Sequence, residues 1–236
     1  MEVLRQAMVS MGIEASRERI DTFSTYRSLV LEWNEKVNLT AIKDPDEFEV
    51  KHFVDSLWAS TYSGFQTAGN VIDIGTGAGF PGLPLAICFP EKQFLLVDSL
   101  NKRIRILNEI IKSLGIVNAV AIHGRAEDLA AQELYRERYD ICLSRAVADL
   151  SVLVEYCLPF VQVGGYFGAY KTEDAEDEIT SSRKALKTLG GRFESATKLT
   201  LEGVDMKHQI LWIEKTAHTP AKYPRKAGTP SKEPIK

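Results

Sequence analysis

Cysteine is scarce in this sequence, and long apolar runs are absent from it. Only three cysteines occur among the 236 residues: Cys88, Cys142 and Cys157. Their number is odd, and their spacing is not that of metal ligands. A disulfide framework is therefore not expected, which favours a reducing, cytoplasmic environment. No apolar run is long enough to span a bilayer, and no basic segment precedes an apolar one at the N-terminus as an export signal. The sequence predicts a cytoplasmic protein without a membrane partner.

Acidic residues are nearly absent from the last 21 residues, 216–236, where Glu233 stands against five basic side chains. This C-terminal segment carries a net charge of +4, and the rest of the chain carries −7, because the whole chain carries −3. Its four prolines exclude a regular helix or a central strand. Basic charge on an acidic body favours a polyanionic partner, and a disordered, solubilising end is the alternative.

Apolar periodicity divides the chain into a helical beginning, an alternating middle and a strand-rich end. Residues 1–60 are predicted to be helical, and one long helix places on a single face Ile20, Phe23, Tyr26, Val30, Trp33 and Val37. Strands are predicted at 71–74, 94–97, 119–122, 141–143 and 166–170, separated by helices at 81–89, 104–114, 126–132 and 150–158. A charged helix over 173–189 and two strands at 192–201 and 208–214 follow.

These elements predict an α/β fold of the Rossmann-like type. Strands that alternate with helices form a parallel sheet with right-handed crossovers. The last two strands have no helix between them, so we expect a mostly parallel seven-stranded sheet with an antiparallel terminal hairpin. The predicted organisation is an N-terminal helical extension (1–60), an α/β domain (61–215) and a basic, proline-rich tail (216–236).

The segment Val71-Ile-Asp-Ile-Gly-Thr-Gly-Ala-Gly-Phe-Pro-Gly82 is a strand that runs into a glycine-rich turn. Such units bind nucleotide-like cofactors, because glycines let the backbone approach the ligand. The part Gly77-Ala-Gly79-Phe-Pro-Gly82 fits the G-x-G-x-x-G pattern of NAD sites. The part from Asp73 through Gly75, Gly77 and Gly79 fits the acid-x-G-x-G-x-G pattern of S-adenosylmethionine (AdoMet) methyltransferases. A carboxylate at Asp73 would repel a pyrophosphate but suits the cationic methionine end of AdoMet. Dehydrogenases also usually lack a terminal hairpin. Both observations favour AdoMet over NAD as the cofactor.

Polar residues follow the ends of consecutive predicted strands, at the edge where open α/β sheets bind ligands. Asp98 stands 21 residues after Gly77, the spacing of a carboxylate that accepts hydrogen bonds from ribose hydroxyls in NAD and AdoMet sites. Ala126-Glu127 is placed to meet the adenine. Phe80 either lines the pocket or packs beside it. This pattern supports a nucleoside cofactor.

The end of the fourth strand, Ser144-Arg-Ala-Val147, indicates which atom is methylated. Enzymes that methylate exocyclic amino groups of bases usually carry Asn/Asp-Pro-Pro-aromatic there, and none of the cysteines is placed to attack a pyrimidine. An acceptor with a free lone pair remains, such as guanine N7, which needs no general base and depends on positioning and electrostatics. Arg145 would hold the nucleic acid or orient the base. The guanine would lie in a loop or be flipped out.

Several short motifs occur together along the chain: Asn38-Leu-Thr40, Asp44-Pro45, His52-Phe-Val-Asp-Ser56, the glycine-rich turn, Asp98-Ser-Leu-Asn-Lys-Arg103 and Ser144-Arg-Ala146. In these motifs the sequence resembles the bacterial small-subunit ribosomal RNA methyltransferase G family, also called glucose-inhibited division protein B. The resemblance implies AdoMet-dependent N7-methylation of one guanine in 16S ribosomal RNA. It also implies AdoMet contacts at Gly75, Phe80, Asp98, Ser99, Leu100, Ala126, Glu127 and Arg145.

Arg145 and Lys171 are the residues that we expect to act on the acceptor, with Lys171 and the segment Asn38-Leu-Thr40 on the RNA side. The predicted partner is 16S ribosomal RNA or the small ribosomal subunit, with no DNA, and nothing marks an obligate interface, so a monomer is expected. His52 and Asp55 stand one helical turn apart, but a metal site needs more ligands, and no metal is expected. Two alternatives stay open: an NAD-dependent dehydrogenase, and an RNA-binding protein that keeps this fold without catalysis.

Overall fold

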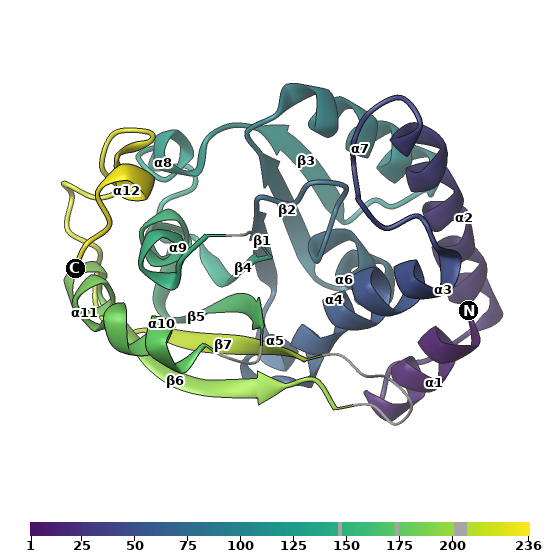
Figure 1. Ribbon diagram of the computed structural model, residues 1–236, viewed down its shortest axis with the longest axis horizontal. Coiled ribbons are helices and arrows are strands. Elements are labelled where there is room, and N and C mark those ends of the chain that lie inside the picture. The colour runs from purple at the N-terminus through teal and green to yellow at the C-terminus, as the bar shows by residue number, and fades with distance from the viewer. Residues whose placement is uncertain (146–147, 173–174, 201–206) are drawn as a thin grey trace.

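The computed structural model describes residues 1–145, 148–172, 175–200 and 207–236, and its centre is one seven-stranded sheet (Figure 1). The strands are β1 (Asn70–Ile74), β2 (Gln93–Asp98), β3 (Ala119–His123), β4 (Tyr139–Ser144), β5 (Val161–Thr172), β6 (Gly191–Lys198) and β7 (His208–Lys215). Their order is β3-β2-β1-β4-β5-β7-β6, with β1 to β5 parallel and β7 antiparallel to both of its neighbours. The predicted sheet and its terminal hairpin are confirmed.

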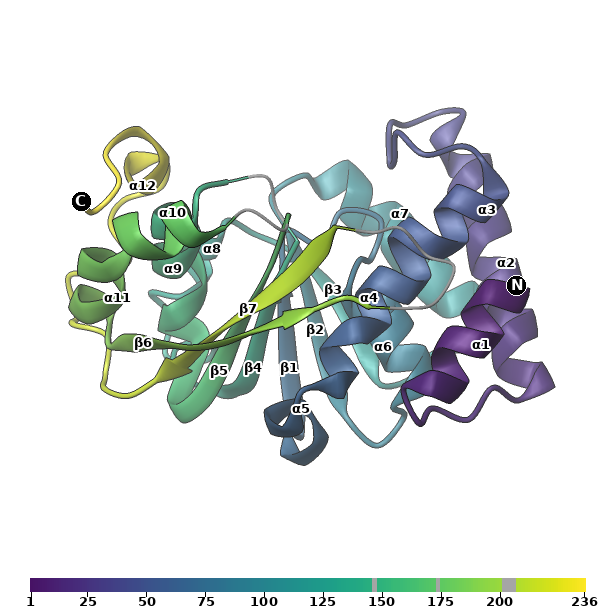
Figure 2. The ribbon, with the colours of Figure 1, turned by 60° about the horizontal axis from the view of Figure 1, so that its bottom comes forward.

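Helices cover both faces of the sheet (Figure 2). One core includes residues of α1 (Glu2–Ser10), α2 (Arg17–Asn34), α3 (Pro45–Phe48), the π-helix η1 (Glu49–Val54), α4 (Asp55–Leu57), the 3-10 helix η2 (Trp58–Thr61), α5 (Ser63–Thr67), α6 (Gly82–Cys88) and α7 (Asn101–Ser113). The other side carries α8 (Ala126–Leu129), α9 (Leu150–Cys157), η3 (Leu158–Phe160), α10 (Glu176–Ser181), α11 (Arg183–Leu189) and α12 (Thr229–Lys232). Val71 belongs to the first core and Ile72 to the second, so successive residues of β1 are buried on opposite faces of the sheet.

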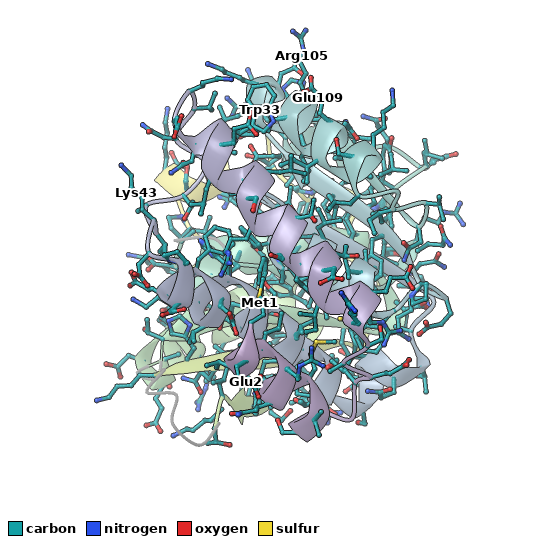
Figure 3. The ribbon with its side chains drawn as sticks, turned by 90° about the vertical axis from the view of Figure 1, so that its right-hand side faces the viewer. Met1, Glu2, Trp33, Lys43, Arg105 and Glu109 are labelled. Carbon is teal, nitrogen blue, oxygen red and sulfur yellow. The ribbon has the colours of Figure 1, made fainter. Side chains whose placement is uncertain are left out.

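The N-terminal helices share the first core with the sheet, and Figure 3 looks onto this layer. The predicted long helix ends at Asn34 instead of continuing to Val37. The side-chain oxygen of Asn34 accepts hydrogen bonds from the amides of Leu39 (2.8 Å) and Thr40 (3.0 Å), so the chain turns back there. The division of the chain at residues 60 and 215 stays a prediction.

Several predicted elements differ in extent from those of the structure, and the strand expected over 166–170 is the longer β5. The helix expected over 126–132 ends at Leu129, and the strand expected over 192–201 ends at Lys198, with residue 201 outside the described residues. The charged helix expected over 173–189 is two helices, α10 and α11, separated at Ser182, and residues 173 and 174 lie outside the described residues. The polar side chains at this break compete for backbone groups, as when Ser181 Oγ donates to the carbonyl of Glu178.

The C-terminal segment is packed against the second helix layer, so the disordered alternative is wrong. Arg136 donates hydrogen bonds to the carbonyls of Thr219 (2.8 Å) and Tyr223 (2.9 Å), and Pro230 is buried. One helical turn, α12, forms despite the prolines, because Pro230 lies in its first turn, where a proline is tolerated.

Candidate active site

The glycine-rich turn joins β1 to α6, and the carboxylate of Asp73 closes it. Gly77 and Gly79 have φ angles of +60° and +108°, which side chains rarely adopt. Asp73 is fully buried, and its Oδ2 accepts hydrogen bonds from Thr76 Oγ1 (2.7 Å) and from the amide of Gly82 (2.9 Å). Asp73 therefore holds the two ends of the turn together.

Gly79→Ala is expected to destabilise the protein more than Gly77→Ala. A Cβ at Gly79 would lie 2.6 Å from Tyr26 Oη and 2.9 Å from Leu107 Cδ1, whereas one at Gly77 meets nothing within 4 Å. The Tyr26 hydroxyl is fixed because it donates to the carbonyl of Ala78 (2.7 Å). Gly77→Ala costs backbone strain of about 1 kcal/mol, and Gly79→Ala adds a clash of about 1–3 kcal/mol. Thermal unfolding compares the two variants, and equal losses would contradict this prediction.

Asp73 also predicts a pH dependence of stability, since burial raises its pKa from 3.8 to about 6. Between these values the folded protein keeps a proton that the unfolded chain has released, so stability falls as the pH rises. A shift of about two pKa units corresponds to about 3 kcal/mol. Asp73→Asn cannot ionise and is expected to remove this fall. Denaturant unfolding of the wild type and of Asp73→Asn at pH 4 and pH 7 measures the change in the free energy of unfolding. An equal change in the two proteins would contradict the prediction.

A cavity of about 210 Å³ lies beside the turn, at the carboxyl ends of β1, β2, β3 and β4. We call it the cofactor cavity, and its lining consists of Ile74, Gly75, Val97, Asp98, Ser99, Gly124, Arg125, Ala126, Glu127, Ser144, Ala148, Leu153 and Tyr156. Five predicted cofactor residues thus come together from three loops: Gly75, Asp98, Ser99, Ala126 and Glu127. Leu153 and Tyr156 on α9 were not predicted, because no motif marks them and only the fold brings α9 to this cavity.

Asp98 organises the cofactor cavity through its two carboxylate oxygens. Oδ2 accepts a hydrogen bond from the amide of Gly77 (3.0 Å), and Oδ1 accepts one from the amide of Leu100 (2.8 Å). Gly77 and Leu100 therefore contact the cavity residue Asp98 without lining the cavity themselves. Gly79 and Phe80 do not line the cavity either, and Phe80 is 5% exposed among aromatic side chains.

A second cavity of about 330 Å³, the acceptor cavity, adjoins the first and shares Ala148 with it. Both predicted acceptor residues line it, and its full lining is Asp55, Arg145, Ala148, Asp149, Tyr170, Lys171, Thr172, Glu178 and His208. These residues lie around the ends of β4 and β5 and the start of β7. Arg145 therefore lines the acceptor cavity and not the cofactor cavity, and residues 146 and 147 lie outside the described residues.

Arg145 is held by the N-terminal helices. Its Nη1 donates to the carbonyl of Lys51 and to Asp55 Oδ2, both at 2.9 Å, and its Nη2 donates to His52 Nδ1 at 3.1 Å. The guanidinium carbon lies 5.1 Å from the centre of the Phe80 ring, in reach of a cation–π contact. The strand end at β4 and the η1 segment are thus joined through one side chain.

Asp55 connects Arg145 to the far end of the chain. Its carboxylate is 2% exposed, and its Oδ1 accepts a hydrogen bond from His208 Nδ1 (3.0 Å) at the start of β7. Burial alone would raise the pKa of Asp55, but the His208 hydrogen bond and the positive charge of Arg145 together hold this pKa below its ordinary value. Asp55 is therefore a carboxylate shared by two side-chain donors, the guanidinium of Arg145 and the imidazole of His208. No pattern in the sequence predicts this arrangement.

His52 is a neutral side chain in this network. Burial first, and then the charge of Arg145, lower its pKa to about 3. Because a guanidinium only donates, Nδ1 of His52 accepts from Arg145 and the ring proton is assigned to Nε2, which lies 2.7 Å from Thr40 Oγ1. The ring stacks on Phe80 with centroids 4.3 Å apart. His52 is thus a fixed support for Arg145 and Phe80, and not a proton carrier.

Lys171 closes the opposite wall of the acceptor cavity. Its Nζ donates to the carbonyl of Ala148 and to Glu178 Oε2, both at 2.5 Å, and its side chain is 9% exposed. The same Glu178 oxygen accepts the amide of Leu150 at the start of α9 (2.8 Å). Lys171 therefore ties the end of β5 to α9 and α10, and no motif in the sequence marks its partner Glu178.

Within the described ranges, no helix is long and apolar enough to cross a membrane. In the same ranges, no three His, Cys, Asp or Glu side chains lie together in a way that could hold a metal ion.

The sheet order, the glycine-rich turn and the carboxylate at the end of β2 define an AdoMet-dependent methyltransferase. A SAM dependent methyltransferase from Aquifex aeolicus has the same fold, with a TM-score of 0.54 at 14% identity over 75% of this chain and 96% of that one. Residues 19–208 match the family model for rRNA small subunit methyltransferase G, GidB. Curated relatives of this name from Alkaliphilus metalliredigens and Clostridium tetani are 47% and 44% identical, over 99% and 100% of this chain and 98% of each relative.

The chain belongs to the rRNA small subunit methyltransferase G family. The resemblance stated from the motifs is therefore confirmed, as is AdoMet as the cofactor. Membership of this methyltransferase family excludes the two alternatives, an NAD-dependent dehydrogenase and an RNA-binding protein that keeps the fold without catalysis.

Proposed function

We propose that this methyltransferase transfers a methyl group from AdoMet to N7 of a guanine in 16S ribosomal RNA of the small subunit. The observation that carries this proposal is the pair of adjoining cavities at one edge of the sheet. One contains the carboxylate Asp98, suited to a nucleoside, and the other contains the cations Arg145 and Lys171, suited to RNA. The name of the curated relatives, ribosomal RNA small subunit methyltransferase G, supports the same substrate.

The cofactor cavity is the proposed AdoMet site. Each oxygen of Asp98 has two lone pairs, so Asp98 can accept ribose hydroxyls while it keeps the amides of Gly77 and Leu100. Ala126-Glu127 would meet the adenine, and Gly75 would give backbone access to the methionine end. AdoMet supplies an activated methyl group when it is bound, and the chain's own residues position it toward the acceptor cavity.

The acceptor cavity is the proposed site of the guanine. Contacts within the described residues use three of the five N–H groups of Arg145, which leaves two for the O6 edge of the base. Thr40 hydrogen-bonds His52 beside Arg145, so the segment 38–40, proposed for the RNA side, lies next to this cavity. Arg145 and Lys171 are therefore the proposed acceptor residues.

Burial of the cysteines supports methylation of a lone pair over a covalent route. Cys142 and Cys157 are fully buried, and Cys88 is 4% exposed. Burial raises the pKa of Cys88 to about 12 and that of Cys142 well above its ordinary value. None of them provides an accessible thiolate for attack on a pyrimidine. Guanine N7 already carries a lone pair, so catalysis depends on in-line positioning.

We extend the proposal to the cellular setting. The enzyme works in the cytoplasm as a monomer, with the small ribosomal subunit or its RNA as partner and with neither DNA nor a membrane.

The test of the proposed methylation uses purified protein, AdoMet and small subunits from cells that lack the gene. Treatment with borohydride and aniline follows, which cleaves RNA at 7-methylguanosine. One new, AdoMet-dependent cleavage in 16S ribosomal RNA is expected. Methyl incorporation without such a cleavage would contradict N7 as the acceptor.

A further inference from the structure

The C-terminal segment lies on the two helices that form one wall of the cofactor cavity. Ala126 and Glu127 of α8 and Leu153 and Tyr156 of α9 line that cavity. Figure 1 shows α12 beside α8 and α9, although α12 is about a hundred positions further along the chain than α8. The segment is therefore placed to act on the cofactor site.

The anchor of the segment is Arg225. Its Nε and Nη2 donate to the two carboxylate oxygens of Glu155, at 2.9 Å and 2.6 Å, and its backbone amide donates to Oε1 at 2.8 Å. Glu155 is fully buried and directly precedes Tyr156 on α9. A buried carboxylate without its cation is strongly unfavourable, so this pair holds the segment and α9 together.

Three residues beyond Arg225, the segment reaches the cavity wall itself. The amide of Gly228 donates to Oε1 of Glu127 (2.9 Å), whose side chain is almost fully buried. Oε2 of Glu127 has no hydrogen-bond partner among the described residues, and it is left for a donor of the ligand. Ser231 Oγ in turn donates to the carbonyl of Gly228 (3.1 Å) and so fixes the turn that carries this amide. The C-terminal segment thus contacts the lining residue Glu127 directly, and it holds the lining residue Tyr156 through the preceding residue, Glu155.

We propose that the C-terminal segment completes the AdoMet site, with Arg225 and Gly228 as positioning residues that hold Tyr156 and Glu127 in place. The inference rests on the proposed AdoMet site in the cofactor cavity. It assigns the anchoring arginine of this basic segment to cofactor binding instead of RNA binding. Because coupling between two sites is reciprocal, bound cofactor must also stabilise the segment.

The first test uses the wild-type chain and S-adenosylhomocysteine, the product form of the cofactor. Hydrogen exchange is measured with and without this ligand. We expect slower exchange of the amides of 225–233 together with those of the glycine-rich turn. Protection of the turn with unchanged exchange in 225–233 would overturn the inference while leaving the proposed function intact. No protection anywhere would overturn the AdoMet site and the inference with it.

The second test compares Arg225→Met with Lys226→Met. Both remove one positive charge from adjacent positions, but Lys226 is exposed and has no side-chain partner among the residues that the structure describes. Arg225→Met is expected to raise KM for AdoMet about tenfold, equivalent to about 1.4 kcal/mol. Lys226→Met is expected to leave it unchanged, and both variants keep kcat at saturating AdoMet.

Binding of 16S ribosomal RNA separates the two roles of the segment. We expect the two variants to bind this RNA equally, since each loses a single charge. Equal KM for AdoMet with weaker RNA binding by Arg225→Met alone would overturn the inference. If Arg225→Met does not fold, the double variant Glu155→Met/Arg225→Met avoids the buried unpaired charge, and it must still show the raised KM for AdoMet.

Discussion

Asp98→Ala is expected to weaken AdoMet binding about 10- to 100-fold while the protein remains folded. Asp98 lines the cofactor cavity and is the carboxylate proposed to accept the ribose hydroxyls. A hydrogen bond to a charged group contributes about 1.5–3 kcal/mol, and each 1.4 kcal/mol is about a tenfold change in affinity. The amides of Gly77 and Leu100 also lose their acceptor, but they lie beside a cavity in which water can replace the carboxylate.

Calorimetric titration with AdoMet measures this effect, and circular dichroism checks the fold. Asp128→Ala is the matched control, because Asp128 is an exposed carboxylate next to the cavity residue Glu127. The control is expected to bind AdoMet like the wild type. If Asp98→Ala binds as tightly as Asp128→Ala, the carboxylate at the end of β2 does not hold the ribose.

Arg145→Met is expected to abolish methyl transfer and to lower the free energy of unfolding by about 3–5 kcal/mol. The loss of activity follows from the place of Arg145 in the acceptor cavity. The loss of stability follows from Asp55, whose carboxylate is 2% exposed and would keep only His208 as a partner. Urea unfolding measures the stability, and methyl transfer to small subunits measures the activity.

The double variant Asp55→Asn/Arg145→Met separates the two effects. It removes the buried negative charge together with its cation, so most of the lost stability is expected to return, while methyl transfer stays absent. If the single variant Arg145→Met keeps the full free energy of unfolding, the buried carboxylate of Asp55 does not need Arg145 as its cation. Activity recovered by the double variant would show that Arg145 acts only through the fold.

The sheet and the cofactor cavity could be predicted because their signals are local. β1 runs directly into the glycine-rich turn, Asp98 is the last residue of β2, and Glu127 lies in the first turn of α8, shortly after the end of β3. Parallel strands end at a common edge, so residues far apart in the sequence meet there without further information. Five of the predicted cofactor residues line one cavity for this reason.

The acceptor cavity could be predicted only in part, because its contacts depend on tertiary packing. Arg145 and Lys171 were found as residues at strand ends, but their partners Asp55 and Glu178 come from helices with no motif for this role. His208 looked like the first residue of a terminal strand. Only the folded chain places it beside Asp55.

The disordered alternative for the C-terminal segment was wrong for a related reason. Its charge and prolines describe a free basic tail, whereas its position depends on contacts with Arg136, Glu127 and Glu155 from other parts of the chain. Glu155 is the only charged residue of helix α9, and such an isolated carboxylate needs a cation when the helix is buried. That residue was the available signal, but nothing in the sequence pairs it with Arg225.

The most direct test of the central claim is nucleoside mass spectrometry of 16S ribosomal RNA from cells with and without this gene. We predict that one 7-methylguanosine is lost with the gene, is restored by the wild-type chain, and is not restored by Asp98→Ala. An unchanged 7-methylguanosine content in cells without the gene would contradict the proposed reaction.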